Sequence, residues 1–569
     1  MATKKPQARR VRSKRRRITP RRWLPFVALV AIAADAFVVE RSLTDEAAPS
    51  NVVNLASTRL PVATESAALS TAWYCSGGTA MGEDGKAELS VVIANAAAAP
   101  TTADVTVVDD DGGEESTTIG VPAYGRTRVT ASEVLKAEWV GMTVEVLGGE
   151  IAVEREVVGP NGYDVSPCSS HAATEWFVPS GSTVIGAEEY LLLYNPFPAA
   201  TSVDITFATD EGALAPRPLQ GLTVAGRSVR LVPTDSLPAR RAEISTHVQV
   251  RSGRLVVDRL QIYDGSGDAM GSDGDDAVTS PPPRGLASSS AIPQASLTWV
   301  FPQGRNDQEV RNQVALYNPG TNTAEVDVIV TFEDPARMPE VEPVAVTIPP
   351  GEQRLVDLTD VVGIENGLDY TIGLVSFGID GAPAQPVVAE LLTFNWLREL
   401  SPQPPPDGEA GGEQPPSDDV DELPPDDGDS TGDGAPPEEL AGVEFVPGFS
   451  VVPGAPVAAS EWILPSRGGT PTRGANVVVA NPSLTTVEVT VEAVVGGRRQ
   501  AVEGATVKIP PRDRRSLNLT TIGPSAALVI SADGAVVVQA TSVSTAGLGS
   551  SGALASPLPD AVMVLPPLR

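Results

Sequence analysis

The sequence contains few of the side chains on which most catalytic and metal sites depend. Its 569 residues include two cysteines, two histidines and only 5% aromatic residues. Neither His171 nor His247 lies in a catalytic motif, and a nucleophile elbow, a zinc-binding helix motif, a P-loop and a dinucleotide-binding turn are all missing. We therefore predict no enzymatic activity, no cofactor and no metal site. Paired carboxylates for glycoside hydrolysis stay open, because their separation depends on the fold.

Long helical patterns of apolar residues are also missing outside the N-terminal region. Gly and Pro number 52 each, and valine and alanine supply most of the apolar residues. Short alternating segments such as 203–207 and 326–330 are typical of half-buried strands. The composition therefore predicts a mainly β protein with small, thin domains.

A repeated phrase divides the chain. A tryptophan, two apolar residues and a proline are followed, 19 residues after the tryptophan, by Asn-Pro, and this happens three times. A fourth, degenerate copy has its asparagine 22 residues after the tryptophan. Such periodicity indicates one structural unit used repeatedly. The pairs are Trp73 with Asn95, Trp176 with Asn195, Trp299 with Asn318, and Trp462 with Asn481.

Each copy predicts an antiparallel Ig-like β-sandwich of about 90 to 110 residues, because several short strands with turn signals follow one another. The tryptophan is expected to bury its ring and to bond a carbonyl through its indole N–H. The asparagine is expected to bind the backbone of the turn that ends its strand. We interpret both residues as structural, and the alternative is a recurring ligand pocket.

The N-terminal region predicts a membrane anchor. Residues 1–22 contain eleven Lys and Arg and no acid, and the apolar run 23–39 follows directly. Positive residues stay on the cytoplasmic side, so we expect a single-pass protein with its N-terminus inside and the bulk of the chain outside the cytoplasm. A cleavable signal peptide, with Ala34-Asp35-Ala36 as the cleavage site, is the alternative and would give a secreted protein.

Charge limits the partners. The net charge is −31 even though residues 1–22 are strongly basic, so the exported part is more acidic still. We therefore exclude nucleic acid as a partner of that part. The basic tail suits the anionic inner surface of the membrane.

The two cysteines, Cys75 and Cys168, enclose the first repeat. In an exported domain they are expected to form a disulfide, which would stabilise that domain by roughly 4 kcal/mol in the chain-entropy model. Two buried free thiols are the alternative.

Two segments have the composition of linkers. Residues 401–445 are acidic, rich in proline and free of Lys and Arg, and residues 264–296 are rich in Gly, Ser, Asp and Pro. We expect the first to be disordered and to separate the fourth repeat from the other three. The predicted organisation is a basic tail (1–22), a transmembrane signal anchor (23–40), a stalk (41–70), sandwich 1 (71–170), sandwich 2 (171–263), a linker (264–296), sandwich 3 (297–400), the acidic linker (401–445) and sandwich 4 (446–569).

The chain resembles an actinobacterial family of secreted or membrane-anchored envelope proteins of unknown function. The resemblance rests on the basic N-terminus with one membrane segment, on Trp73-Tyr74-Cys75, on Cys168 and on the Trp to Asn-Pro repeats. The chain departs from the family at Ser76, where the family often has proline. The resemblance implies location and architecture, and it implies no catalytic or binding residues.

These observations favour a non-enzymatic envelope protein that binds or scaffolds cell-wall glycan or other envelope proteins. The alternative is a carbohydrate-binding module or an accessory enzyme of envelope polysaccharide metabolism. Tyr194 and Tyr317, which directly precede the Asn-Pro pairs, are the candidate ligand contacts. An exposed platform formed by these rings, or by Tyr190, Phe377 or Trp396, would favour sugar binding, whereas buried rings would favour the scaffold.

Overall fold

The computed structural model describes residues 59–569 apart from several gaps. The chain divides into two compact units, 1–51 and 52–569, and every described residue lies in the second. The predicted basic tail (1–22) and anchor (23–40) are therefore outside the described residues. Among the described residues, no helix has the length and apolarity needed to cross a membrane. The gaps are 235–236, 271–280, 308, 334–340, 365, 380, 401–442, 467–471, 519–525, 545–549, 567 and 569.

The described chain is mainly β, as predicted, and each repeat contributes about eight strands in the same order. Repeat 1 comprises β1 (Ser70–Ala80), β2 (Glu88–Asn95), β3 (Thr101–Asp109), β4 (Glu114–Val121), β5 (Gly125–Thr130), β6 (Ala137–Leu147), β7 (Ile151–Gly159) and β8 (Gly162–Pro167). Repeat 2 comprises β9 (Glu175–Val178), β10 (Ala187–Asn195), β11 (Thr201–Thr209), β12 (Gly212–Leu214), β13 (Gln220–Val224), β14 (Ser228–Pro233), β15 (Ile244–Ser252), β16 (Val256–Asp264) and β17 (Arg284–Ser290).

Repeats 3 and 4 follow the same order. Repeat 3 comprises β18 (Thr298–Arg305), β19 (Val310–Tyr317), β20 (Ala324–Phe332), β21 (Val344–Ile348), β22 (Gln353–Asp357), β23 (Asp369–Phe377), β24 (Val388–Leu400) and β25 (Val443–Pro453). Repeat 4 comprises β26 (Ala458–Leu464), β27 (Thr472–Ala480), β28 (Val487–Val495), β29 (Arg498–Ile509), β30 (Arg514–Asn518), β31 (Ala527–Ser544), β32 (Ser550–Leu554), β33 (Ser556–Pro557) and β34 (Val562–Met563). The helices among the described residues are single turns, α3 (Ala131–Val134), η2 (Gly82–Asp84), η3 (Arg217–Leu219), η5 (Leu358–Asp360) and η7 (Pro559–Ala561).

Repeats 2 and 3 each form two sheets, and in repeats 1 and 4 the corresponding strands are joined into one sheet, through β1 with β2 and through the long strand β31. Repeat 2 shows the arrangement most simply. Its outer sheet contains the tryptophan strand, in the order β12-β11-β15-β9 with β13 on β11, and its inner sheet has the order β14-β10-β16-β17. All pairs in these two sheets are antiparallel. The last strand of each inner sheet, namely β8, β17, β25 or β32, is called its central strand below.

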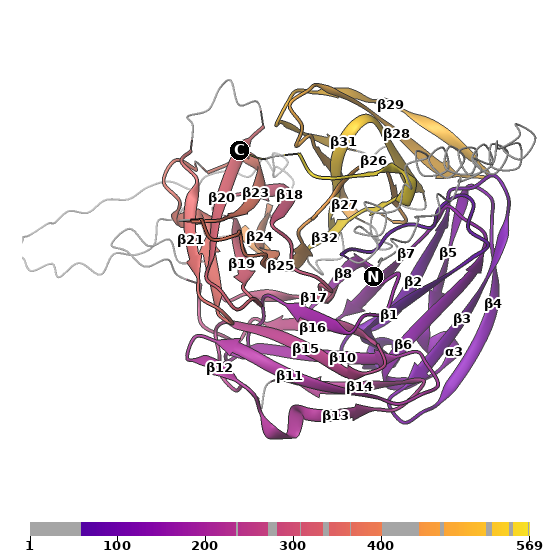
Figure 1. The fold of residues 1–569 in the computed structure, drawn as a ribbon. Helices are drawn as coiled ribbons and strands as arrows, with labels where there is room; N and C mark the ends of the chain where they lie inside the picture. Colours follow the sequence, from indigo (N-terminus) through magenta and orange to yellow (C-terminus); the bar gives the residue numbers. More distant parts are fainter. Residues whose placement is uncertain are drawn as a thin grey trace, which may run out of the picture. The chain divides into compact units, whose positions relative to one another are not determined.

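The four repeats close into a ring around the central strands. Strand β8 contacts β17, β17 contacts β25, β25 contacts β32, and β32 contacts β8 again. The inner sheet of each repeat also packs against the outer sheet of the preceding repeat. Examples are β16 of repeat 2, which packs on β1 of repeat 1, and β31 of repeat 4, which packs on β18 of repeat 3. Figure 1 shows the sheets of all four repeats gathered around these strands. The arrangement is propeller-like, and the four contacts are called junctions 1/2, 2/3, 3/4 and 4/1.

The expected string of independent Ig-like sandwiches is therefore wrong, although the β class is correct. The inner strands show the physical reason, because β7 and β16 are buried on both faces rather than on alternate residues. A sheet covered on both sides must pack against two neighbours. Here the second neighbour is the adjacent repeat.

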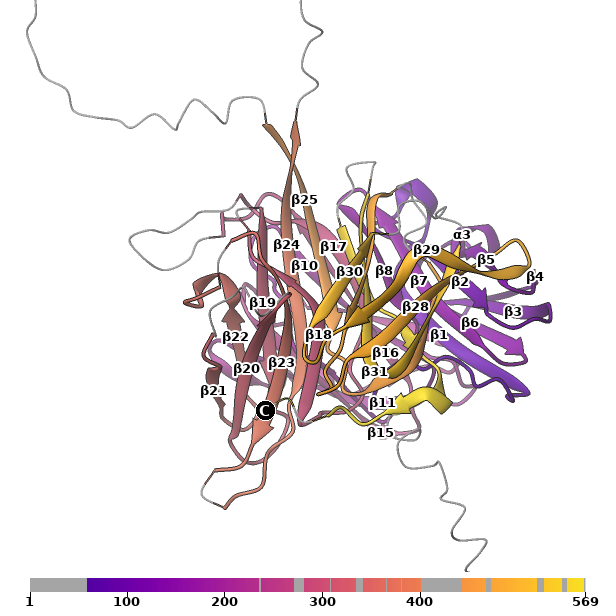
Figure 2. The same ribbon diagram turned by 90° about the horizontal axis from the view of Figure 1, so that it is seen from above.

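Both predicted linkers turn out to lie within repeats. Residues 401–442 connect β24 to β25, which pair from Leu400–Val443 to Glu390–Pro453. Residues 265–283 connect β16 to β17, which pair from Asp264–Arg284 to Asp258–Ser290. Figure 2 shows β24 and β25 projecting together from the sheets. The acidic segment thus joins two strands of one hairpin and does not separate repeat 4, so the boundaries at 263, 296, 400 and 446 are corrected.

The predicted stalk, 41–70, also requires correction at its C-terminal end. Leu60 and Val62 belong to the core cluster of repeat 4, and Ala63 is buried beside the junction with repeat 1. The Ala63 amide donates to Pro557 O at 2.9 Å, and Thr64 exchanges backbone bonds with repeat 1. This short segment therefore bridges the first and last repeats where the ring closes.

Candidate functional site

The four repeat tryptophans lie in the core. Each side chain is at most 1% exposed. The indole N–H of Trp176 donates to Leu255 O at 3.0 Å, that of Trp299 to Val387 O at 3.0 Å, and that of Trp462 to Val536 O at 3.2 Å. Within the part of the chain that the structure describes, the Trp73 indole nitrogen has no hydrogen-bond partner. These rings hold the outer sheet to the inner sheet of their own repeat.

The four repeat asparagines are buried at the end of the second strand of their repeats. The Asn481 amide nitrogen donates to Thr485 O at 2.8 Å and to Ile509 O at 3.0 Å, while its oxygen accepts from the Ser483 amide at 3.0 Å. Asn95, Asn195 and Asn318 make corresponding bonds. Each asparagine side chain thus links the turn directly after it to a backbone carbonyl at the end of a later strand of the same repeat. This arrangement leaves little amide capacity for a ligand.

The turn opposite each asparagine contains one residue with a left-handed backbone. These residues occupy the same place in the four repeats, and their φ angles lie between 45° and 70°. Only one of them is glycine, although that conformation costs other residues about 1 kcal/mol or more. They are Tyr124, Arg227, Gly351 and Arg512.

Tyr194 and Tyr317 lie inside junctions. Tyr194 is 1% exposed, and its hydroxyl is 2.5 Å from the Thr143 hydroxyl of repeat 1. A Cβ at Gly141 would come within 2.7 Å of this ring, so glycine permits the close approach. Tyr317 is 6% exposed and packs beside Phe177 of repeat 2. Neither ring is available to a surface ligand.

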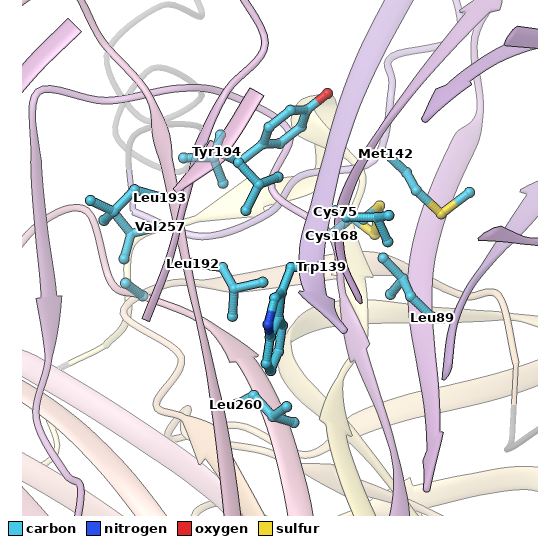
Figure 3. Close-up of a cluster of buried hydrophobic side chains, with 14 of the residues drawn as sticks. Cys75, Leu89, Trp139, Met142, Cys168, Leu192, Leu193, Tyr194, Val257 and Leu260 are labelled. Carbon is cyan, nitrogen blue, oxygen red and sulfur yellow. A yellow bond between two sulfur atoms is a disulfide. The ribbon is translucent and has the colours of Figure 1, made fainter. Parts of the chain in front are cut away.

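Cys75 and Cys168 form the predicted disulfide. Cys75 lies on β1 of the outer sheet, and Cys168 directly follows the central strand β8. The bond therefore clamps the two sheets of repeat 1 in the interior, as Figure 3 shows beside Trp139 and Met142.

A buried polar contact that the repeat analysis missed joins neighbouring repeats. At junction 1/2, Ser76 donates its amide (2.8 Å) and its hydroxyl (2.5 Å) to the Asp258 carboxylate. Arg155 binds the same carboxylate at 2.8 Å and the Ser76 carbonyl at 2.6 Å. All three side chains are fully buried. Repeat 1 thus supplies the serine and the arginine, and repeat 2 supplies the acid.

Junction 2/3 repeats this arrangement. The Ser180 hydroxyl donates to the Glu390 carboxylate at 2.7 Å, and Arg259 binds that carboxylate at 3.2 Å and the Ser180 carbonyl at 2.5 Å. At junction 4/1, Ser466 donates its amide and hydroxyl to Glu154, both at 2.9 Å. The sequence contains a signal for these contacts, because acid-arginine pairs interrupt the apolar runs 151–155 and 255–259.

At junctions 3/4 and 4/1, one or both of the acid and arginine positions hold other residues. Strand pairing makes Glu154, Asp258, Glu390 and Gln539 equivalent, since each lies opposite the residue three before a repeat asparagine. The residue that follows each acid or amide is Arg155, Arg259, Leu391 and Ala540 in turn. Junction 3/4 is therefore neutral at both positions, and junction 4/1 keeps the acid without the arginine.

Burial changes the protonation of several interior carboxyl groups. Desolvation raises the pKa of Glu154 to about 8, although the Ser466 bonds favour its ionised form. Desolvation raises the pKa of Asp164, on the central strand β8, to about 7, and that of Glu189 to about 7. These groups are neutral or partly neutral at pH 7, which reduces the cost of burying them.

Both histidines lie against aromatic side chains of repeat 2. His171 stacks on Trp176, and burial lowers its pKa to about 4. His247 stacks on Phe177, and its Nε2 lies 2.9 Å from a Glu175 oxygen. Both rings pack against residues of the repeat core.

A cavity with a volume of about 290 Å³ lies at junction 2/3. Its floor comes from β19, β22 and β24 of repeat 3, and its opposite wall from the segment 179–186 that follows β9 and from the start of β15 with the two residues before it in repeat 2. Most of its surface is apolar, with a few glutamine, glutamate and serine groups. These are the properties of a small ligand-binding pocket.

The fold and these contacts define a class, a propeller-like ring of four β repeats with buried polar junctions. Residues 159–281 match a family of unknown function, DUF5719. The matched segment begins at the end of β7 and continues past β16, so it covers one central strand and most of repeat 2. No curated protein matches the chain.

Three solved structures show limited similarity. Thermotoga maritima 1070 is 22% identical, with 18% of this chain and 83% of that chain covered and a TM-score of 0.15. A tetra-tandem repeat from the extending region of a large adhesion protein is 11% identical, with 80% and 92% covered and a TM-score of 0.10. A glycoside hydrolase of family 32 from Bifidobacterium adolescentis is 10% identical, with 85% and 99% covered and a TM-score of 0.12. Scores this low carry no argument about fold or function.

Proposed function

We propose that the protein is a non-enzymatic, extracytoplasmic binding module or scaffold of the cell envelope, held on the cytoplasmic membrane by residues 23–40. The observation that carries this proposal is the closure of the ring. Buried polar contacts at three junctions and the bridge at residues 60–64 fix all four repeats in one unit. A unit with fixed repeats presents surfaces with constant spacing, which suits a scaffold.

The burial of the aromatic rings supports the scaffold over a carbohydrate module. Tyr194, Tyr317 and Trp396 are all at most 6% exposed. Tyr190 is half-buried and packs against Trp139, and Phe377 lies half-buried on β23. Sugar binding by stacking needs an exposed ring face, and none of these side chains offers a full one.

Membrane anchoring is tested with the full chain expressed in a bacterial host. We expect the protein to stay in the membrane fraction after alkaline extraction and to be cut by protease added outside intact spheroplasts. A matched control replaces residues 23–40 with a cleavable signal peptide, and it should be released as a folded, soluble protein. Release of the unaltered chain would instead support a cleaved signal peptide.

Binding is tested with the full chain in detergent, applied in parallel to purified envelope glycan and to envelope membrane proteins. Saturable retention of protein partners supports the scaffold. Retention on glycan alone, or turnover of the glycan, would replace the proposal with the carbohydrate alternative.

A further inference from the structure

The cavity at junction 2/3 has a filled counterpart one repeat earlier. At junction 1/2 the ring of Trp139 packs against that of Tyr190, with centroids 4.9 Å apart and the ring planes tilted by 40°. Trp139, Leu192 and Leu260 belong to one buried cluster, in which Figure 3 shows the indole near both leucines. Aromatic and leucine side chains from the two repeats thus close this junction completely.

Strand pairing identifies the equivalent residues at junction 2/3. Trp73 pairs with Val144 and Trp176 with Val248, so Glu243 takes the place of Trp139, five residues earlier. On the other side, Ala315 takes the place of Leu192 and Gln313 the place of Tyr190. Glu243, Gln313 and Ala315 all line the cavity. The cavity therefore exists because three large apolar or aromatic side chains are replaced by smaller or polar ones.

The cavity keeps the apolar floor of the filled junction. Leu355 and Leu392 take the places of Leu231 and Leu260, and Phe394 extends the floor. Such a floor favours an apolar group of the same kind that occupies junction 1/2.

The rim of the cavity offers an unused hydrogen-bond donor. Gln353 is 7% exposed, and its side-chain oxygen accepts from the Ser245 hydroxyl at 2.6 Å. Its amide nitrogen has no partner among the described residues. A buried donor without a partner is costly, so a ligand that supplies an acceptor would gain from this contact. Glu243 adds an acceptor on the facing wall.

We propose that this cavity binds an aromatic side chain presented by a partner protein, which takes the place that Trp139 fills at junction 1/2. The segments 271–280 and 401–442, which lie outside the described residues, cannot supply the ring because they contain no aromatic residue. Aromatic anchors in such pockets dominate the energetics of many protein interfaces. This inference deepens the proposed function and rests on it for the nature of the partner.

The test uses the full chain in detergent and N-acetyltryptophanamide as the probe, with N-acetylalaninamide as the control. Calorimetry or ligand-observed NMR is expected to show binding of the aromatic probe only, with a Kd of about 1 mM, as befits one isolated anchor. A tripeptide with a central tryptophan is expected to bind at least as tightly. Tighter binding of free indole than of the tripeptide would overturn the assignment to a protein partner.

Two variants assign the binding to this cavity. Glu243→Trp combined with Gln313→Tyr rebuilds the Trp139 and Tyr190 pair of junction 1/2 at junction 2/3. Ala315→Leu restores only the counterpart of Leu192. We expect each to weaken probe binding at least tenfold while the Tm stays level or rises. Unchanged binding in both folded variants, or no binding of the probe to the unaltered chain, would overturn the inference.

The outcome also separates this inference from the proposed function. If envelope proteins are retained equally by the unaltered chain and by the filled variants, the scaffold stands and the cavity assignment fails. If the probe binds but the chain retains no envelope protein, the cavity takes up aromatic rings but the partner proposal fails.

Discussion

Junctions 1/2 and 3/4 are built from corresponding strands, yet they differ at the two positions that hold the acid and the arginine in junction 1/2. Junction 1/2 sets the Arg155 guanidinium 2.8 Å from the Asp258 carboxylate. Junction 3/4 has Leu391 and Gln539 at these positions. In these two junctions arginine and acid are therefore present together or replaced together. This is expected if the cost of a buried ion is tolerable only beside its partner.

The central strands follow the same rule. The Arg155 Nε donates to the Ser166 hydroxyl at 2.9 Å, and one Arg259 guanidinium nitrogen donates to the Ser289 hydroxyl at 2.8 Å. In repeats 3 and 4 the cross-strand pairs at this place are Leu391 with Val452 and Ala540 with Ala553. The acid, the arginine and the serine of the central strand thus occur together at junctions 1/2 and 2/3, whereas all three positions hold uncharged residues at junction 3/4.

Junction 4/1 is intermediate. Glu154 faces Ser466 as in the charged junctions, but Ala540 replaces the arginine. Burial raises the pKa of Glu154 to about 8, so the group is largely protonated at neutral pH. Protonation of Glu154 removes its buried negative charge, whereas at junctions 1/2 and 2/3 an arginine balances the charge of the acid.

The largest effect is expected when one partner of a charged junction is removed. Arg155→Leu leaves Asp258 buried without its cation and should lower the free energy of unfolding by about 3 to 5 kcal/mol. The double variant Arg155→Leu with Asp258→Gln copies junction 3/4 and should recover most of that loss. Urea unfolding of the single and double variants measures both values. Equal losses in the two variants would contradict the pairing rule.

The disulfide is the next largest difference between repeats. Cys75 and Cys168 are 93 residues apart, and repeat 1 is also the repeat whose tryptophan lacks an indole hydrogen bond in the described structure. Replacing both with alanine should destabilise repeat 1 by about 4 kcal/mol in the chain-entropy model. Hydrogen exchange should show the loss first in β1 to β8. Uniform loss across all four repeats would mean that the ring unfolds only as a whole.

The pH dependence distinguishes junction 4/1 from the others. A carboxyl group whose folded pKa is raised binds more protons in the folded state, so its stabilising contribution is complete below the unfolded pKa of about 4.5 and is lost as pH rises toward 8. Stability should fall by up to about 1.4 kcal/mol per pH unit for Glu154 in this window. Glu154→Gln, which copies Gln539, should flatten the slope in unfolding measurements between pH 5 and 8. An unchanged slope would assign it to other groups, such as Asp164.

The smallest expected effect is the difference in unfolding free energy between variants of two repeat asparagines. Asn481 makes bonds to Thr485, Ile509 and Pro510 carbonyls at 2.8 to 3.0 Å, whereas the second donor bond of Asn95, to Pro122, is 3.2 Å long. Asn481→Ala should lower the free energy of unfolding by about 2 kcal/mol, and Asn95→Ala by about 1 kcal/mol. Thermal unfolding of the two variants measures the difference. A larger loss at Asn95 would reverse the order.

Much of the local structure could be predicted from the sequence. The spacing of Trp299 and Asn318, for example, identifies a strand opening and a strand end, because both depend on residues close in the chain. The disulfide was predictable because only two cysteines exist. The prediction of ligand contacts was less successful. Tyr194 and Tyr317 have the sequence positions of surface residues, but a neighbouring repeat covers both rings.

The two linkers show why the remainder was not predictable. The segment 401–442 has the composition of a spacer between domains, and composition does not reveal that β25 returns to pair with β24. The acid at 390 and the arginine at 259 similarly appear as ordinary charges in strand sequences. Their partnership depends on two repeats meeting face to face, which no local pattern records.

The sequence by itself determined four copies of a β unit, their tryptophan and asparagine contacts, the disulfide and the acidic balance of the chain after residue 22. These properties follow from side-chain periodicity, turn chemistry and charge, which act over short stretches of chain. Only the tertiary structure decided that the units close into a ring, that acid and arginine meet at junctions 1/2 and 2/3, and that a cavity lies at junction 2/3. The reason is that burial of a group in this ring depends on residues more than 100 positions away, such as Ser180 and Glu390.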